Sequence, residues 1–150
     1  MASENPQLQV TTIDMNPRGA NVTKANIEDA GLVNRIEVLE GDGVDVLTQV
    51  REQVFAGSRP LYDFFFIDDF KGNDWRYFQL AREIVKPNSV ICVDGVVQDS
   101  QVVDFDDSDP SVEGSREMIE KAGKEPGVDS VLLQTVGEKG YDGWLWAVVS

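Results

Sequence analysis

The run at residues 62–71 (YDFFFIDDFK) decides the fold class of this chain. Its apolar residues end abruptly at Asp68 and Asp69, and Lys71 follows two positions later. A second run, 90–94 (VICVD), has the same form, because its apolar residues also end in a carboxylate. Buried strands of parallel sheets read as nearly continuous apolar runs, and open α/β sheets bind ligands at the carboxyl ends of their strands. The sequence therefore predicts two parallel strands with a cofactor or metal site at their ends.

Apolar and turn patterns elsewhere predict that strands and helices alternate along the chain. Strands are expected at 8–13, 35–39, 62–67, 90–93, 130–136 and 144–149, and helices at about 17–30, 47–54, 77–84 and 112–122. The last two strands are joined too closely for a crossover helix, so they should form an antiparallel hairpin. This order predicts an α/β, doubly wound, mainly parallel sheet with a C-terminal hairpin. The length of 150 residues suits one domain over 1–150.

Composition narrows the chemistry. The net charge of −14 argues against nucleic acid and anionic membranes as partners. No apolar run approaches the roughly 20 residues that span a bilayer, so a cytoplasmic protein is expected. The absence of histidine excludes Ser-His and Cys-His nucleophiles and His-ligated zinc. Carboxylates and lysine remain, and carboxylates favour hard cations such as Mg²⁺. The single cysteine, Cys92, lies in an apolar strand and should be a buried structural thiol.

Six short motifs lie in order along nearly the whole chain: 10–14 (VTTID), 25–32 (ANIEDAGL), 40–43 (EGDG), 66–71 (FIDDFK), 93–97 (VDGVV) and 137–143 (GEKGYDG). Together they resemble the cation-dependent class I O-methyltransferases that use S-adenosylmethionine. Catechol and caffeoyl-CoA O-methyltransferases are known branches of that family. The resemblance implies a Rossmann-like fold, S-adenosylmethionine as cofactor and a phenolic or catechol-like acceptor. It also allows a homodimer.

The resemblance assigns roles to individual residues. Asp14 would hold the cofactor ribose, since a carboxylate at a strand end can accept both hydroxyls. The segment Gly41, Asp42, Gly43 would lie beside the adenine, where glycines let the backbone approach a flat ring. The cofactor-binding set is completed by Asp68 and Asp69.

The same resemblance assigns the chemistry of methyl transfer. Asp68 and Asp94 would together hold a divalent cation, most simply Mg²⁺, which would bind the acceptor oxygen and lower its pKa. Lys71 would take or stabilise the proton of the acceptor hydroxyl. The oxygen would then attack the sulfonium methyl group in line.

Each of these residues also has an ordinary structural explanation. Asp14 is equally suited to cap a helix or to lie in a loop. Gly41 and Gly43 are typical of a tight turn. Lys71 could be a surface lysine at a helix start. These alternatives stay open on the sequence alone.

The sequence also departs from the family. Gly95 follows Asp94 where the family usually has an asparagine whose amide oxygen is a third metal ligand, so metal affinity should fall. Asp74 stands where the family tends to have an aromatic residue. The family's first strand, glycine-rich loop and N-terminal helices are expected to be missing. That would leave the strands ending at Asp14 and Ile67 with unpaired edges, as in a truncated or degenerate member.

Two other functions therefore remain alternatives. One is a non-catalytic binding or regulatory module on the same fold, which the missing segment and Gly95 favour. The other is a nucleotide-dependent oxidoreductase, because Asp14 would also suit the ribose of NAD. No glycine-rich G-x-G-x-x-G segment precedes the strand that ends at Asp14 to support it.

Overall fold

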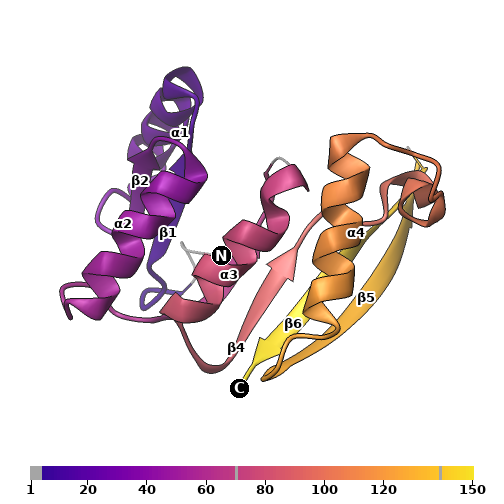
Figure 1. Ribbon diagram of the computed structural model, residues 1–150. Coiled ribbons are helices and arrows are strands. Elements are labelled where there is room, and N and C mark those ends of the chain that lie inside the picture. Colours follow the sequence, from indigo (N-terminus) through magenta and orange to yellow (C-terminus); the bar gives the residue numbers. More distant parts are fainter. Residues whose placement is uncertain (1–4, 70, 139) are drawn as a thin grey trace. The chain divides into compact units, whose positions relative to one another are not determined.

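The computed structural model describes residues 5–69, 71–138 and 140–150. The motif residues Phe70 and Lys139 and the first four residues of the chain lie outside the described part. The chain divides into two compact units, one up to Val50 and one from Arg51 onward. Each unit is described by itself (Figure 1).

The first unit is a parallel strand pair with a crossover helix. Strand β1 (Val10–Asp14) is followed by helix α1 (Pro17–Asp29) and strand β2 (Ile36–Glu40), and helix α2 (Gly43–Phe55) runs on past the unit boundary. The two strands pair in parallel, with Asp14 opposite Glu40 at the carboxyl end. A parallel pair needs such a crossover, because its two strands run in the same direction.

Helix α1 begins and ends where its sequence predicts. The Asn16 side chain accepts a hydrogen bond from the Arg18 amide at 3.0 Å, and Pro17 occupies the first turn, where a missing N–H costs nothing. Ala20 and Ile27 are its buried residues. Both belong to the apolar stripe that the helical period predicts.

The second unit is a mixed four-stranded sheet in the order β3-β4-β6-β5. Strands β3 and β4 are parallel, and the remaining pairs are antiparallel, so the predicted C-terminal hairpin is confirmed. Its elements are β3 (Tyr62–Ile67), the 3-10 turn η1 (Lys71–Asn73), α3 (Asp74–Ile84), β4 (Val85–Val93), the 3-10 segment η2 (Gln98–Val103), α4 (Pro110–Ala122), β5 (Val128–Gly137) and β6 (Gly140–Val149).

The two faces of this sheet differ. Helices α3 and α4 lie on one face (Figure 1), and strands β3, β4 and β6 bury residues on that face. The buried residues are Ile67, Ile91, Val93, Leu145 and Ala147, whereas Leu132 of β5 on the same face is 40% exposed. The register places Phe66, Cys92, Trp146 and Val131 in one row on the opposite face. We call this opposite side the open sheet face. Its exposed apolar residues are Phe64, Phe66, Val131, Leu133, Trp144 and Val148.

Strands β1 and β3 each lie at the edge of their sheet. Among the described residues, β1 pairs with β2 alone and β3 pairs with β4 alone, so each keeps one unpaired edge. The strand expected at 90–93 is longer in the structure, because β4 already begins at Val85. This longer strand contains an irregularity: Asn88 has φ +65°, and the register with β3 jumps from Val85 to Val90. No helix in the described part of the chain is long and apolar enough to cross a membrane.

Candidate active site

The parallel pair β3 and β4 places two of the predicted site residues on adjoining strand ends. Ile67 lies opposite Val93 in the register, and the Asp94 amide donates to the Ile67 carbonyl oxygen at 2.9 Å. Asp68 and Asp94 therefore leave the sheet side by side, as the sequence predicts. Asp68 is exposed and Asp94 is half-buried.

Lys71 reaches the same point from the turn η1. Its Nζ donates to the main-chain oxygen of Asp94 at 2.5 Å. The side chain crosses directly over Gly95: a Cβ added to that glycine would lie 3.0 Å from Lys71 Cε and 3.3 Å from Nζ. Gly95 also has φ +66°, a conformation that favours glycine. The missing side chain at position 95 thus leaves room for the lysine.

The loop after Gly95 is fixed by Asp142, which the sequence places in the motif at 137–143. Oδ1 of Asp142, at the start of β6, accepts hydrogen bonds from the amides of Val97 at 3.0 Å, Gln98 at 3.1 Å and Gly143 at 2.8 Å. Its Oδ2 lies 3.7 Å from the position of a Cβ on Gly95. The only sequence signal was a carboxylate in a glycine-rich hairpin turn.

The neighbouring acids differ in their surroundings. Asp69 accepts a hydrogen bond from the Tyr77 hydroxyl of α3 at 2.9 Å, so it has a structural partner. Asp74 is completely buried, and neither carboxyl oxygen has a hydrogen-bond partner among the described residues. Burial raises the pKa of Asp74 to about 7, the positive charge of Lys71 opposes that rise, and Asp69 and Asp68 add to it. Sequence reasoning noted Asp74 only as a departure from an aromatic residue.

In the first unit, Asp14 lies beside the segment expected to approach the adenine. The Gly41 amide donates to the Asp14 carbonyl oxygen at 3.2 Å. The carboxylate of Asp14 accepts from the Asn16 amide at 2.8 Å, so it also supports the start of α1. A Cβ on Gly19 would lie 2.5 Å from Asp14 Oδ2. Gly19, which the sequence did not single out, therefore leaves the space in which this carboxylate lies.

The glycine segment is shaped by its turn. Gly41 has φ +143°, and a Cβ there would approach Val46 Cγ2 to 2.9 Å, so a side chain is excluded on both grounds. Asp42 Oδ1 accepts from the amides of Val44 at 2.9 Å and Asp45 at 3.3 Å, which makes it the cap of α2. Gly43 is the buried first residue of that helix. The structure thus brings Asp14 together with Gly41 in the first unit, and Lys71 together with Asp94 in the second.

The cation that the resemblance implies is not matched by a complete ligand set. Within the described ranges there is no group of three or more acidic, histidine or cysteine side chains that could hold a metal ion. Gly95 offers no side-chain oxygen, and the Lys71 side chain lies over it. The residues present therefore do not fit a divalent cation bound by three protein side chains.

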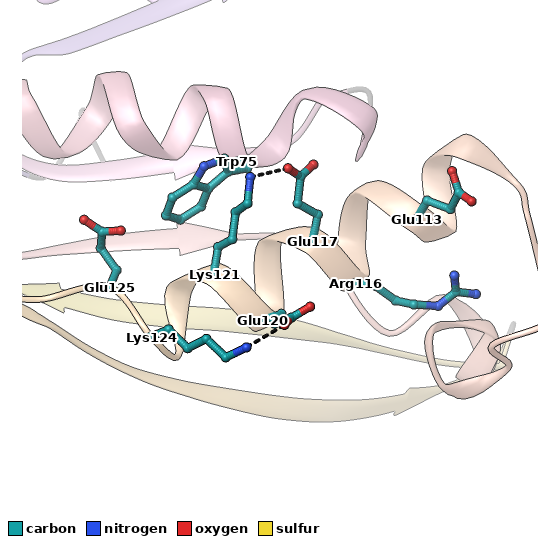
Figure 2. Close-up of a pocket in the computed structure, with 8 residues that line it drawn as sticks. All are labelled: Trp75, Glu113, Arg116, Glu117, Glu120, Lys121, Lys124 and Glu125. Carbon is teal, nitrogen blue, oxygen red and sulfur yellow. Dashed lines mark hydrogen bonds and ion pairs between the residues drawn. The ribbon is translucent and has the colours of Figure 1, made fainter.

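A groove on the second unit is lined by a different set of residues from the predicted site. It has a volume of about 570 Å³ and is lined by Trp75 and by charged residues of α4 and the turn after it (Figure 2). Lys121 pairs with Glu117 and lies 5.4 Å from the centre of the Trp75 ring, and Lys124 pairs with Glu120 at 2.5 Å. Because these charges of both signs already pair with each other, we assign the groove no ligand.

The fold of this chain is similar to solved structures of known proteins. The solved structure of an O-methyltransferase from Bacillus cereus in complex with SAH superposes with a TM-score of 0.88 at 39% identity, covering 95% of this chain and 63% of that one. Together with the strand-end acids, this likeness defines the chain as an α/β, Rossmann-like methyltransferase fold.

The sequence comparisons name the family. The sequence model of the O-methyltransferase family matches residues 1–140. The O-methyltransferase imqG of Aspergillus flavus is 42% identical, over 99% of this chain and 61% of its own length. A catechol O-methyltransferase of Niastella koreensis is 35% identical, over 94% of this chain and 62% of its own length. The chain belongs to the O-methyltransferase family, and it spans about three fifths of the length of these relatives.

Proposed function

We propose that this chain is the part of an S-adenosylmethionine-dependent O-methyltransferase that holds the adenosine end of the cofactor and the acceptor hydroxyl. The acceptor class we propose is a phenol or catechol, in a cytoplasmic protein. The observation that carries the proposal is the pairing of Lys71 with the end of β4 beside Asp68 and Asp94, in a chain of this family. When bound, the cofactor supplies an electrophilic methyl group on a positively charged sulfur.

The chain's own residues divide the work. Asp14, hydrogen-bonded to the start of α1, presents a fixed carboxylate that can accept the ribose hydroxyls. Gly41 has no side chain, so its main chain can approach the flat adenine ring closely. Lys71 Nζ has three donors, and among the described residues its one hydrogen bond is to the Asp94 carbonyl oxygen. The other two donors can hold the acceptor oxygen and stabilise its negative charge as the hydroxyl proton passes to solvent.

Divalent-cation assistance is the less supported form of this proposal. Asp68 and Asp94 would hold the ion, and Mg²⁺ commonly keeps several waters, so two carboxylates can form a weak site. The Niastella relative is named a catechol O-methyltransferase, which supports the acceptor class but says nothing of the ion.

The test is methyl transfer itself. The chain is incubated with methyl-labelled S-adenosylmethionine and a panel of catechols and monophenols, and label in the acceptor is counted. We expect transfer that is lost in Lys71→Met and kept in Lys86→Met, a control lysine paired with Asp63. Binding of S-adenosylhomocysteine without any transfer would favour instead the non-catalytic module on the same fold, for which Gly95 is the supporting departure.

A further inference from the structure

The side chain of Lys71 fills the space above Gly95. A Cβ at position 95 would lie 3.0 Å from Lys71 Cε and 3.3 Å from Nζ. A side chain there would therefore compete with the lysine for the same space. Gly95 and Lys71 therefore pack closely together: a side chain at position 95 would crowd the lysine where it donates to the Asp94 carbonyl oxygen.

The surroundings of the Lys71 ammonium are acidic on several sides. Lys71 Nζ donates to the main-chain oxygen of Asp94, and Asp142 Oδ2 lies 3.7 Å from the same Cβ position on Gly95 that the lysine approaches. The charge of Lys71 also acts on the buried carboxyl group of Asp74 at the start of α3. The ammonium group thus lies close to the carboxylates of Asp142 and Asp74 at the end of β4.

We propose that the Lys71 ammonium, lying over Gly95, is the resident positive charge of this site and takes the place that a divalent cation would need. This inference rests on the proposed function for its meaning, since the charge would serve the acceptor oxygen. A metal ion bound between Asp68 and Asp94 would have to approach an ammonium that is already hydrogen-bonded to the main-chain oxygen of Asp94, and like charges repel strongly in a partly buried site. The ammonium also uses the coordination space that an oxygen ligand at position 95 would fill.

The test measures Mn²⁺ binding to the full chain by electron paramagnetic resonance, with no cofactor and no acceptor present. The wild type should show no Mn²⁺ site that depends on Asp94 up to millimolar metal. Lys71→Met removes the ammonium and should create an Mn²⁺ site that depends on Asp94. The Mn²⁺ affinity of this variant should exceed that of the wild type at least tenfold. Gly95→Asn adds an amide oxygen and pushes Lys71 aside, because the new Cβ would lie 3.0 Å from its Cε, and it should raise affinity independently.

Lys86→Met is the matched control. It changes the net charge by the same amount, but its ammonium is bonded to Asp63 Oδ1 at 2.5 Å, away from the strand end. Mn²⁺ affinity should not change in this variant. An equal gain in Lys86→Met would show that only overall charge matters, and this would overturn the proposal.

Two further results would also overturn it. One is a wild-type Mn²⁺ site that disappears in Asp94→Asn. The other is Lys71→Met and Gly95→Asn variants that stay folded by circular dichroism and gain no affinity. If Lys71→Met does not fold, Gly95→Asn decides alone. Because neither cofactor nor acceptor is used, failure here leaves the proposed methyl transfer standing, and failure of methyl transfer leaves this result standing.

Discussion

The carboxyl group of Asp74 is fully buried at the start of α3, with both oxygens lacking a hydrogen-bond partner among the described residues. Its pKa is raised from 3.8 to about 7, mainly by burial. An acid whose folded-state pKa is raised binds its proton more tightly in the folded chain. The stability that Asp74 contributes is therefore fully present below its unfolded-state pKa of 3.8 and is lost as the pH rises towards its folded-state pKa of about 7.

Replacing Asp74 with asparagine should remove this loss. We expect Asp74→Asn to match the wild type in stability near pH 4 and to exceed it above pH 7, by up to about 4 kcal/mol for a rise of this size. Urea unfolding at a series of pH values measures the difference. Asp129→Asn, an exposed aspartate of β5, is the control and should change little at any pH. An Asp74→Asn variant that is no more stable at pH 8 than at pH 4, relative to the wild type, would contradict the assignment.

At the residue scale, the sequence predicted which side chains lie at strand ends but not how they are held. Asp68, Lys71 and Asp94 could be predicted because apolar strands end at acids and the lysine follows. Asp142 and Gly95 could not be linked, because their positions are brought together by a hairpin that closes far along the chain. The burial of Asp74 depends on packing around α3, which a local pattern does not contain.

The packing of α4 against η1 decides how the lysine is presented. A Cβ on Gly114 of α4 would lie 2.2 Å from the Lys71 carbonyl oxygen and 2.7 Å from Gly72 Cα. These are backbone atoms, so they cannot move aside as a flexible side chain can. Gly114 is thus the residue that lets α4 approach the turn carrying Lys71.

Gly114→Ala should push the turn away from the helix. We expect a loss of about 1–3 kcal/mol in stability, typical of overpacking, and a fall in methyl transfer larger than the loss of folded protein explains. Thermal unfolding and the labelled assay measure the two effects. Gly123→Ala is the matched control at the end of the same helix, where a Cβ meets nothing closer than 3.5 Å. Equal effects of the two alanines would show that the contact is unimportant.

The elements themselves were largely predictable from sequence. Each strand and long helix overlaps the segment expected for it, with ends that differ by a few residues, since apolar periods, caps such as Asn16, and turn residues all agree. The early start of β4 at Val85 could not be predicted, because Pro87 and Asn88 mark an irregularity within a strand as well as they mark a loop. Gly114 could not be found at all, because nothing local distinguishes a close helix contact from a flexible position.

For the molecule as a whole, the open sheet face is the feature that decides its behaviour in solution. Phe64 and Phe66 are 49% and 50% exposed, and Val131, Leu133, Trp144 and Val148 lie on the same face. Exposed apolar surfaces of this kind mark interaction sites or aggregation-prone regions. The unpaired edge of β3 adds a second route to association.

We therefore expect the chain to self-associate as its concentration rises, and more so when salt screens its net charge of −14. Multi-angle light scattering over a range of concentrations measures this. Leu133→Lys, which places a charge on the open sheet face, should keep the chain monomeric at concentrations where the wild type associates. Val103→Lys, at an exposed valine of η2, should not. A wild type that stays monomeric throughout would contradict the expectation.

The central claim is that this chain carries the adenosine-binding residues of an O-methyltransferase, and S-adenosylhomocysteine binding followed by ¹H–¹⁵N NMR tests it most directly. We predict chemical-shift changes centred on the amides of Asp14, Gly41, Asp42 and Gly43, and their loss in Asp14→Asn. The dissociation constant should be weaker than micromolar, equivalent to less than about 8 kcal/mol, because the chain spans only about three fifths of the length of its relatives. No shifts at millimolar ligand, or shifts at other residues that Asp14→Asn leaves unchanged, would contradict the account.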